Sequence, residues 1–264
     1  MLTLYHLFVS HFSEKARWAL DYKGLPYRSR LLVPGAHLLT AKRVAGSSTV
    51  PILVDSENKV VVNDSTDILH YLDRMCPSPP LFPHDADDAA RVAEIENFCD
   101  EHCAPNVGSY LYFYITQYPQ VLGRLFQQGL GPAERLLVRL SLPLVRRGIQ
   151  RRRALTPDNT SRRRADLLAA LDQVERWISA AEGPFLVGDQ FSAADLTVAA
   201  LLGPAVRPAG SPWDPANLDE MPMPVGYPPE EVTEFFRGIG ARPVADWVRE
   251  MWTNHRRPDR APAQ

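Results

Sequence analysis

The 264-residue chain has few cysteines, no long apolar run and almost no excess of either charge. No apolar run approaches the roughly 20 residues of a membrane-spanning helix, so no membrane partner is expected. Lysine and arginine number 29 against 31 aspartate and glutamate, a formal net charge of −2, which gives no reason to expect a nucleic acid partner. Residues 1–5 lack the basic and apolar regions of a secretory signal peptide, and a cytoplasmic protein is therefore expected.

The three cysteines, Cys76, Cys99 and Cys103, fit a reducing compartment because their number is low and odd. Cys99 and Cys103 are four residues apart on a predicted helix. A metal site at this pair is conceivable, but small residues at such a spacing usually pack in the core. Since no further ligands follow at suitable spacing, we expect no metal.

What the sequence does have is a change of pattern near residue 78. Before that point, apolar and β-prone runs alternate with helix-forming segments and end in a hairpin followed by a helix. The order is β-α-β-α-β-β-α, which predicts a small α/β domain that begins with a parallel βαβ unit. The expected strands are residues 2–8, 27–33, 51–54 and 59–62, and the expected helices are residues 13–23, 37–44 and 65–74.

After the proline-rich stretch 77–80 the β signal nearly vanishes, which predicts a linker and then a helical domain. The predicted fold class is therefore α+β. Residues 110–126 are rich in aromatics, and the proline- and glycine-rich residues 203–229 predict an irregular excursion. The expected helices are 89–103, 133–153, 161–181, 192–202, 230–239 and 244–254. The expected division is a first domain at 1–78, a linker at 79–90, a helical domain at 91–255 and a disordered tail at 256–264.

A proline that opens an apolar run is the most informative local feature. Proline cannot donate to a β-ladder, so Pro51 is expected at the start of a strand. The Val50–Pro51 peptide can be cis at modest cost, and a cis bond would turn the backbone N–H and C=O of Val50 outward, able to pair with an extended peptide. Asp64 and Ser65 follow at the start of a helix, whose free N–H groups hold a carboxylate. Together these residues predict a site for a small, charged, peptide-like molecule.

Four segments together resemble the cytosolic glutathione transferase superfamily. Residues 5–20 are similar to its first strand, active-site loop and first helix, and Val50-Pro51 matches its cis-proline position. Asp64-Ser65 matches its acidic-serine pair, and residues 183–195 resemble the buried capping segment of its second domain. The resemblance runs from about residue 2 to about residue 202. Within the superfamily, the chain is most similar to the serine- and cysteine-type, bacterial-like members. It implies a thioredoxin-like α/β domain followed by an all-α domain.

The resemblance implies that glutathione, or a related thiol, is the co-substrate and that Ser10 hydrogen-bonds its sulfur. The thiolate is the nucleophile, and a hydroxyl donor close to a helix N-terminus favours this anion. From the residues alone, an N-cap is the more natural role for Ser10 or Ser13. The resemblance favours Ser10 as the catalytic residue, with Ser13 as the runner-up.

By the same resemblance, the backbone of Val50, next to Pro51, pairs with the cysteinyl part of the thiol. Ser65 and the helix N–H groups take its γ-glutamyl carboxylate, while Asp64 faces its ammonium group. The ordinary alternatives are the start of a strand at Pro51 and a helix cap at Asp64.

One position departs from the family pattern. Many members carry a lysine just before the Val-Pro pair that helps to bind the glycyl carboxylate, whereas this chain has Ser48 and Thr49. Thr49 is counted among the thiol-binding residues. Lys42, Arg43 or His37 is a candidate replacement for the lysine; otherwise the thiol is not glutathione, or it binds weakly.

The second substrate is expected in an apolar pocket walled by aromatic residues of the stretch Tyr110, Tyr112, Phe113 and Tyr114, because ligand clefts are commonly aromatic. Phe12, Tyr110 and Tyr114 are the residues chosen for this pocket. The alternative is that these aromatic residues belong to the core. Residues 130–153 exceed what the family core requires and are a candidate cover for this cleft. An arginine cluster in the same region either draws anionic substrates, contacts a partner or lies on a solvated pair of helices. Its members are Arg146, Arg147, Arg151, Arg152, Arg153, Arg162, Arg163 and Arg164.

The predicted function is that of a glutathione S-transferase-like detoxification enzyme, in which a thiolate stabilised by Ser10 attacks a small electrophile. The resemblance also implies a homodimer. Two alternatives stay open. One is a non-catalytic binding or regulatory protein that retains the fold, and the other is a thiol-dependent isomerase or reductive lyase.

Overall fold

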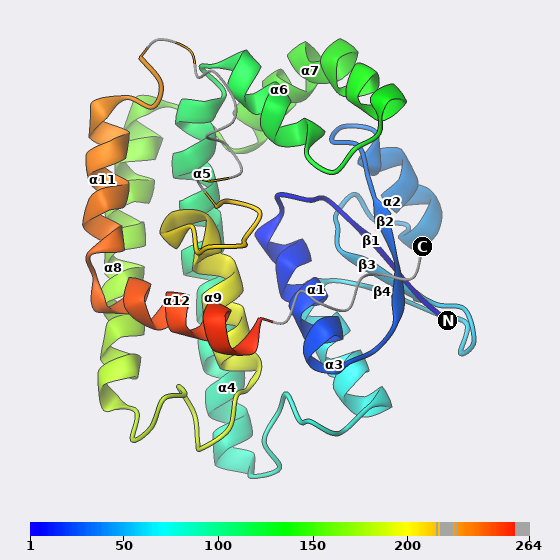
Figure 1. Ribbon diagram of the computed structural model, residues 1–264, viewed down its shortest axis with the longest axis vertical. Helices are drawn as coiled ribbons and strands as arrows, with labels where there is room; N and C mark the ends of the chain where they lie inside the picture. The colour runs from blue at the N-terminus through cyan, green and yellow to red at the C-terminus, as the bar shows by residue number, and fades with distance from the viewer. Residues whose placement is uncertain (215, 217–223, 225, 257–264) are drawn as a thin grey trace.

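The chain folds into a small sheet domain followed by a bundle of helices, which is the α+β architecture predicted from the sequence (Figure 1). The computed structural model describes residues 1–214, 216, 224 and 226–256. The excursion predicted at 203–229 lies partly outside the described residues, and the tail predicted at 256–264 lies outside them except for Arg256. The first domain is thioredoxin-like, and the second is helical throughout its described part.

The four strands of the first domain form one mixed sheet in the order β2-β1-β3-β4. β1 is parallel to β2 and antiparallel to β3, which is antiparallel to β4. Tyr5 lies opposite Ile52, and Ile52 lies opposite Asn63. The segments that leave β1, lead into β3 and leave β4 therefore meet at one end of the sheet. The strands are β1 (Leu2–His6), β2 (Tyr27–Leu31), β3 (Ile52–Asp55) and β4 (Val60–Asn63).

Helix α1 packs between the sheet and the second domain, because its apolar side chains share one core cluster with residues of β1, β3 and α9. Trp18 and Leu20 are fully buried with Leu4 and Leu53 of the sheet. The Trp18 ring also packs edge-on against Trp252 of the last helix, with 5.0 Å between ring centroids. The helices of the first domain are α1 (His11–Tyr22), α2 (His37–Ala45) and α3 (Ser65–Met75).

The second domain is built around α9, which is buried along its whole length and accordingly has no polar face. Figure 1 shows α8 and α11 on the side of this domain that is away from the sheet. The helices are α4 (Ala86–Phe98), a π-helical turn η1 (Cys99–Cys103), α5 (Ala104–Ile115), α6 (Pro119–Gln127), α7 (Pro132–Arg152), α8 (Pro157–Ala180), α9 (Ala193–Val206), α11 (Glu230–Gly240) and α12 (Pro243–His255).

The start of the first helix of the second domain differs from the sequence expectation. Helix α4 begins inside the stretch predicted as the linker 79–90, because the Asp85 carboxylate accepts hydrogen bonds from the N–H groups of Asp87 and Asp88 and so caps the helix. The aromatic-rich stretch 110–126 belongs to two helices, since a new helix starts at Pro119, a residue that suits the first turn.

A second apolar cluster joins the α6–α7 pair to the first domain. Leu122 and Phe126 of α6 pack with Val145 of α7, and Val9 and Leu31 of the first domain pack against them. Residues 130–153, predicted as a cover for the cleft, therefore lie against the segment that follows β1. This contact brings the C-terminal end of α7 to the same place as the convergent end of the sheet.

Candidate functional site

The turn that leads into β3 has the conformation expected from its proline. The Val50–Pro51 peptide bond is cis, as predicted. Asn63, at the end of β4, donates hydrogen bonds from Nδ2 to the C=O of Pro51 (3.0 Å) and to the C=O of Thr49 (3.2 Å). No described residue is hydrogen-bonded to the backbone of Val50, so its N–H and C=O are available to a ligand.

A cavity of about 290 Å³ opens beside this turn. Ser10 and Phe12 line it from the start of α1, and Thr49 and Val50 line it from the turn before β3. Further walls come from the start of α2, from α5 and α6, from the C-terminal end of α7, and from the end of α9 with residues that follow it. The structure thus brings four of the predicted site residues to one cavity at the junction of the two domains.

Ser10 caps α1 and still has a proton to donate. Its Oγ accepts a hydrogen bond from the Ser13 N–H at 3.2 Å, and its backbone is extended, as in a helix N-cap. A hydroxyl has one donor and two acceptor sites, so the cap leaves the Ser10 O–H free for a ligand. The two roles considered for Ser10 are therefore compatible.

Ser13, the other candidate hydroxyl, is fully buried and does not line the cavity. Its Oγ accepts a hydrogen bond from the Leu7 N–H at 3.4 Å. It supports the loop before α1 from beneath, and the Ser10 hydroxyl lies at the cavity wall instead.

Arg17 holds the loop that presents Ser10, a role that the sequence did not suggest. Its Nη2 donates to the C=O of Phe8 at 3.0 Å, and its Nη1 lies 2.8 Å from Nδ1 of His6. The Arg17 guanidinium also pairs with the buried Glu14 carboxylate, which Arg256 contacts from the end of α12 at 2.7 Å. Although burial opposes ionisation of Glu14, these two arginines lower its pKa to about 2. This ionic cluster ties the Ser10 loop to the last helix.

Asp64 and Ser65 begin α3 but do not line the cavity. Oδ1 of Asp64 accepts a hydrogen bond from the Thr66 N–H at 2.8 Å, which makes Asp64 the N-cap. Ser65 is buried at the first helical position. The sheet register places both beyond Asn63, next to the Val50–Pro51 turn, so they extend the site past the cavity itself.

A buried lysine lies behind the start of α3. Nζ of Lys15 is 2.8 Å from Oε1 of Glu96, 3.1 Å from Oδ2 of Asp100 and 3.1 Å from Oγ1 of Thr66. The Lys15 side chain is fully buried, and that of Glu96 is 2% exposed. The Thr66 hydroxyl also donates to Asp100 at 3.1 Å. This group joins α1 and α3 to the first helices of the second domain.

The cavity is rich in positive charge. Arg152 and Arg153 from the end of α7 and Arg207 from the end of α9 line it, and no aspartate or glutamate of the described residues does. The two histidines in its wall are neutral: burial, with Arg153 adding to it, lowers the pKa of His11 to about 3, and burial and Arg152 lower the pKa of His37.

Of the three residues considered as replacements for the missing lysine, only His37 is in the cavity wall of the described structure. Its Nδ1 accepts a hydrogen bond from the Gly35 N–H at 3.0 Å. Lys42 instead donates to the C=O of Gly46 on the exposed side of α2, and Arg43 is exposed on the same helix. Arg152, beside His37, is the guanidinium that sequence reasoning did not connect with this position.

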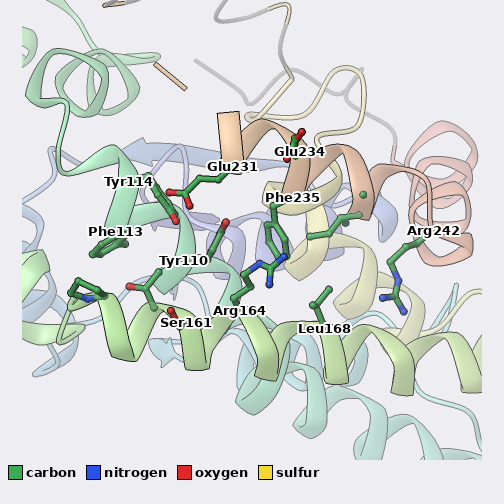
Figure 2. A pocket seen from close by; sticks show the side chains of 14 residues that line it. Tyr110, Phe113, Tyr114, Ser161, Arg164, Leu168, Glu231, Glu234, Phe235 and Arg242 are labelled. Carbon is green, nitrogen blue, oxygen red and sulfur yellow. The ribbon is translucent and has the colours of Figure 1, made fainter. Parts of the chain in front are cut away.

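The three predicted second-substrate residues do not share one cavity. Phe12 lies beside Ser10, whereas Tyr110 and Tyr114 line a separate cavity of about 780 Å³ between α5, α8 and α11. Figure 2 shows both tyrosines there with Arg164, Glu231 and Phe235. The aromatic residue of α5 at the Ser10 cavity is Tyr112, which the sequence offered as a pocket residue but which is not one of the three chosen.

The cysteine pair lies in the core. Cys99 and Cys103 are fully buried in the π-helical turn, and their proximity together with burial raises the pKa of the Cys99 thiol. No group of metal-ligating side chains occurs among the described residues. Within the same residues, no helix is both long and apolar enough to cross a membrane.

Residues 4–80 match the family model described as the glutathione S-transferase N-terminal domain. Glutathione S-transferase Z1 of Arabidopsis thaliana is 40% identical over 87 residues, which is 32% of this chain and 38% of that protein. Glutathione S-transferase U2 of the same plant is 32% identical over 98 residues, 37% of this chain and 43% of that protein. The chain thus matches less than half the length of these curated relatives.

Solved structures resemble both domains. The β-etherase LigF of Sphingobium sp. strain SYK-6 has a TM-score of 0.60 at 20% identity and covers 94% of this chain and 98% of its own. A glutathione S-transferase of Methylobacterium radiotolerans, crystallised with glutathione sulfonate, has a TM-score of 0.55 at 21% identity and covers 94% of each chain. At these identities the likeness concerns the fold.

Proposed function

We propose that this chain, as a member of the glutathione S-transferase superfamily, is a transferase. It joins glutathione, or a related thiol, to a small electrophile. The observation that carries the proposal is the convergence of Ser10 with the Val50–Pro51 turn on one cavity. A free hydroxyl proton and an unpaired strand-like backbone are the two groups needed to hold a peptide thiol with its sulfur at a fixed point.

In this proposal the residues of the first domain bind and orient the thiol. The N–H and C=O of Val50 pair with its cysteinyl backbone, and the start of α3, with Ser65 and Asp64, holds its γ-glutamyl end. The Ser10 hydroxyl donates to the sulfur and favours the thiolate, aided by the N-terminus of α1. A C–S bond then forms at the electrophilic carbon while the leaving group departs with its bonding electrons, and the thiol proton passes to solvent.

We assign the glycyl carboxylate of the thiol to Arg152. This side chain lines the cavity with His37 and with Ser48 and Thr49, which stand where the family pattern has a lysine before the Val-Pro pair. The Arg152 guanidinium from α7 would take the place of the lysine ammonium group of the first domain. A guanidinium can bind a carboxylate through two hydrogen bonds.

Two variants of Ser10 separate catalysis from capping. Ser10→Ala removes the hydroxyl and the cap, which costs about 0.5–2 kcal/mol of stability, whereas Ser10→Gly removes the hydroxyl at a cost of only a few tenths. Both are expected to lower turnover of 1-chloro-2,4-dinitrobenzene at saturating glutathione by roughly 10- to 100-fold, because a charge-assisted hydrogen bond to the sulfur is lost. The pH at which half-maximal kcat/KM is reached should rise in both.

The matched control is Asp85→Ala, which removes a cap far from the cavity, at the start of α4. It should lose stability like Ser10→Ala and keep wild-type turnover. A Ser10→Gly enzyme that conjugates at the wild-type rate would exclude Ser10 from the mechanism.

The same preparation tests the two alternative functions. Retention on immobilised glutathione without turnover of any tested electrophile would indicate a non-catalytic binding protein. Failure to bind any low-molecular-weight thiol would also favour a non-catalytic role, that of a regulatory protein. Recovery of glutathione unchanged after a substrate has rearranged would indicate an isomerase, and recovery as its disulfide would indicate reductive cleavage.

We also propose that the protein is a cytoplasmic homodimer with a role in detoxification, as the resemblance implies. Light scattering at micromolar concentration measures the oligomeric state. A mass of one chain, 29.6 kDa, at all concentrations would contradict the dimer.

A further inference from the structure

We propose that the electrophile is an aromatic molecule that carries a carboxylate or a comparable anionic group, and that Arg153 receives this group. The proposal rests on the proposed transferase function and names its substrate class. It is carried by the position of the Arg153 guanidinium, which lies in the same cavity as Ser10 and pairs with no carboxylate of the described residues.

Arg153 follows the last turn of α7 and lines the cavity from the side of the helical domain. Its guanidinium lies over the ring of Tyr112, 5.1 Å from the ring centroid, and Nη1 is 3.5 Å from Oγ of Ser109. It forms no ion pair with any carboxylate in the described part of the chain. Arginine carries five N–H donors, and most of those of Arg153 have no acceptor among the residues that the structure describes.

The charged groups around Arg153 have its own sign. Burial lowers the pKa of Arg153, and the nearby Arg152 and Arg163 lower it further. Arg207 lines the same cavity, and the described wall contains no carboxylate. Arg153 is partly shielded from water, and a shielded charge is normally paired with an opposite one. The described wall offers no such partner, so an anionic ligand can supply it.

The rest of the wall suits a flat ring. Phe12, Leu111, Ile115 and Trp213 line the cavity together with Tyr112. An aromatic ring packed on these side chains would leave a carboxylate within reach of the Arg153 guanidinium, whose planar fork matches carboxylate geometry. Such a ligand combines apolar burial with neutralisation of the cation.

The anion has two sources, because the thiol also carries carboxylates. Arg152 lies beside His37 of the first domain, as the effect of its charge on the pKa of His37 shows. Arg153 instead contacts α5, where its Nη1 would be 2.9 Å from a Cβ at Gly108. We therefore assign Arg152 to the thiol and Arg153 to the second substrate, and the experiment below separates the two.

Binding of 3-nitrobenzoate and of its neutral counterpart 3-nitrobenzamide is measured by calorimetry, with and without saturating glutathione. Neither probe has a leaving group, so no turnover occurs. The wild-type protein should bind the benzoate on the order of 10- to 100-fold more tightly than the amide. Arg153→Gln should reduce this ratio to nearly one, Arg153→Lys should keep part of it, and the exposed Arg151→Gln should keep all of it.

Turnover supplies an independent readout. With 4-chloro-3-nitrobenzoate and 4-chloro-3-nitrobenzamide, a C–S bond forms, the C–Cl bond breaks and chloride leaves with the electron pair. The wild-type enzyme should have the lower KM for the benzoate, and Arg153→Gln should remove that difference.

Equal binding of benzoate and amide by the wild-type protein would overturn the proposal without any variant. Loss of the benzoate preference when glutathione is present would also overturn it, since the guanidinium would then serve the thiol. If glutathione itself does not bind while the benzoate preference persists, the proposed transferase function fails and the anion site stands. Benzoate preference with a bound thiol supports both.

Discussion

The buried lysine of α1 offers a sharp test of how the two domains are held together. Lys15 contacts Glu96 and Asp100 of the second domain and Thr66 at the start of α3, at distances of 2.8 to 3.1 Å for the closest atom of each. Replacing Lys15 by Met keeps a similar apolar stem and removes the charge. Glu96, 2% exposed, would then lose its cation in a site that water hardly reaches.

The expected cost follows from the charge left behind. Removing one partner of a buried ion pair destabilises a protein by about 3–5 kcal/mol, because the remaining charge is desolvated and unpaired. Neutralising that charge as well should recover part of the loss. We expect the double variant Lys15→Met, Glu96→Gln to be less destabilised than the sum of the single variants by at least about 1 kcal/mol.

Urea unfolding at pH 7, followed by tryptophan fluorescence, measures these free energies. Trp18 and Trp252 are in contact across the domain junction and report on its separation. Lys42→Met is the matched control, since Lys42 lies on the exposed side of α2, and it should change stability by less than about 0.5 kcal/mol. If Lys15→Met stays within 1 kcal/mol of the wild type, or if the two single effects simply add, the ionic group does not join the domains as described.

Two further predictions concern groups beside the cavity. The pKa of Glu14 is about 2 in the folded protein and about 4.5 when unfolded, so its contribution to stability is complete above pH 4.5 and disappears as the pH falls toward 2. The urea midpoint should therefore fall steeply below pH 4.5 in the wild type and less steeply in Glu14→Gln; equal slopes would contradict this. Gly108→Ala places a methyl group against Nη1 of Arg153 and should weaken 3-nitrobenzoate binding several-fold without loss of stability, whereas Gly148→Ala, whose added Cβ meets nothing within 4 Å, should not. Unchanged 3-nitrobenzoate affinity in Gly108→Ala would show that the position of Arg153 beside Gly108 is not required for binding the carboxylate.

The first domain could be predicted well because its signals are local. Strand and helix propensities change within a few residues, and Pro51 fixes the start of a strand wherever the rest of the chain lies. Once the strand order is known, the register brings the segments after β1, before β3 and after β4 to one place. The meeting of Ser10 with Val50 therefore followed from the order of the elements.

The aromatic residues of α5 show where such reasoning stops. Tyr110 and Tyr114 are four residues apart and so share one face of the helix, while Tyr112 is on nearly the opposite face. The sequence shows this division but not which face meets the first domain. That choice depends on the packing of α5 against α8 and α11, and it directs Tyr112 to the Ser10 cavity and the other pair to the second cavity.

The arginine cluster divides for the same reason. Arg163 donates to Asn106, Arg164 lies over Phe235 and Arg151 is exposed, so neighbours in sequence have different surroundings. Composition alone predicted a positive region with several possible roles. The structure singles out Arg153 because α7 packs on the segment after β1 and turns this residue into the cavity wall.

The amino-acid sequence by itself determined the order of strands and helices, the prolyl turn and the hydroxyl that begins α1, since each depends on residues close together in the chain. Only the tertiary structure decided which helix face and which guanidinium reach that hydroxyl. The reason is that helical phase and the pairing of buried charges are set by contacts between segments up to about 240 residues apart, as between Glu14 and Arg256, and no local pattern encodes them.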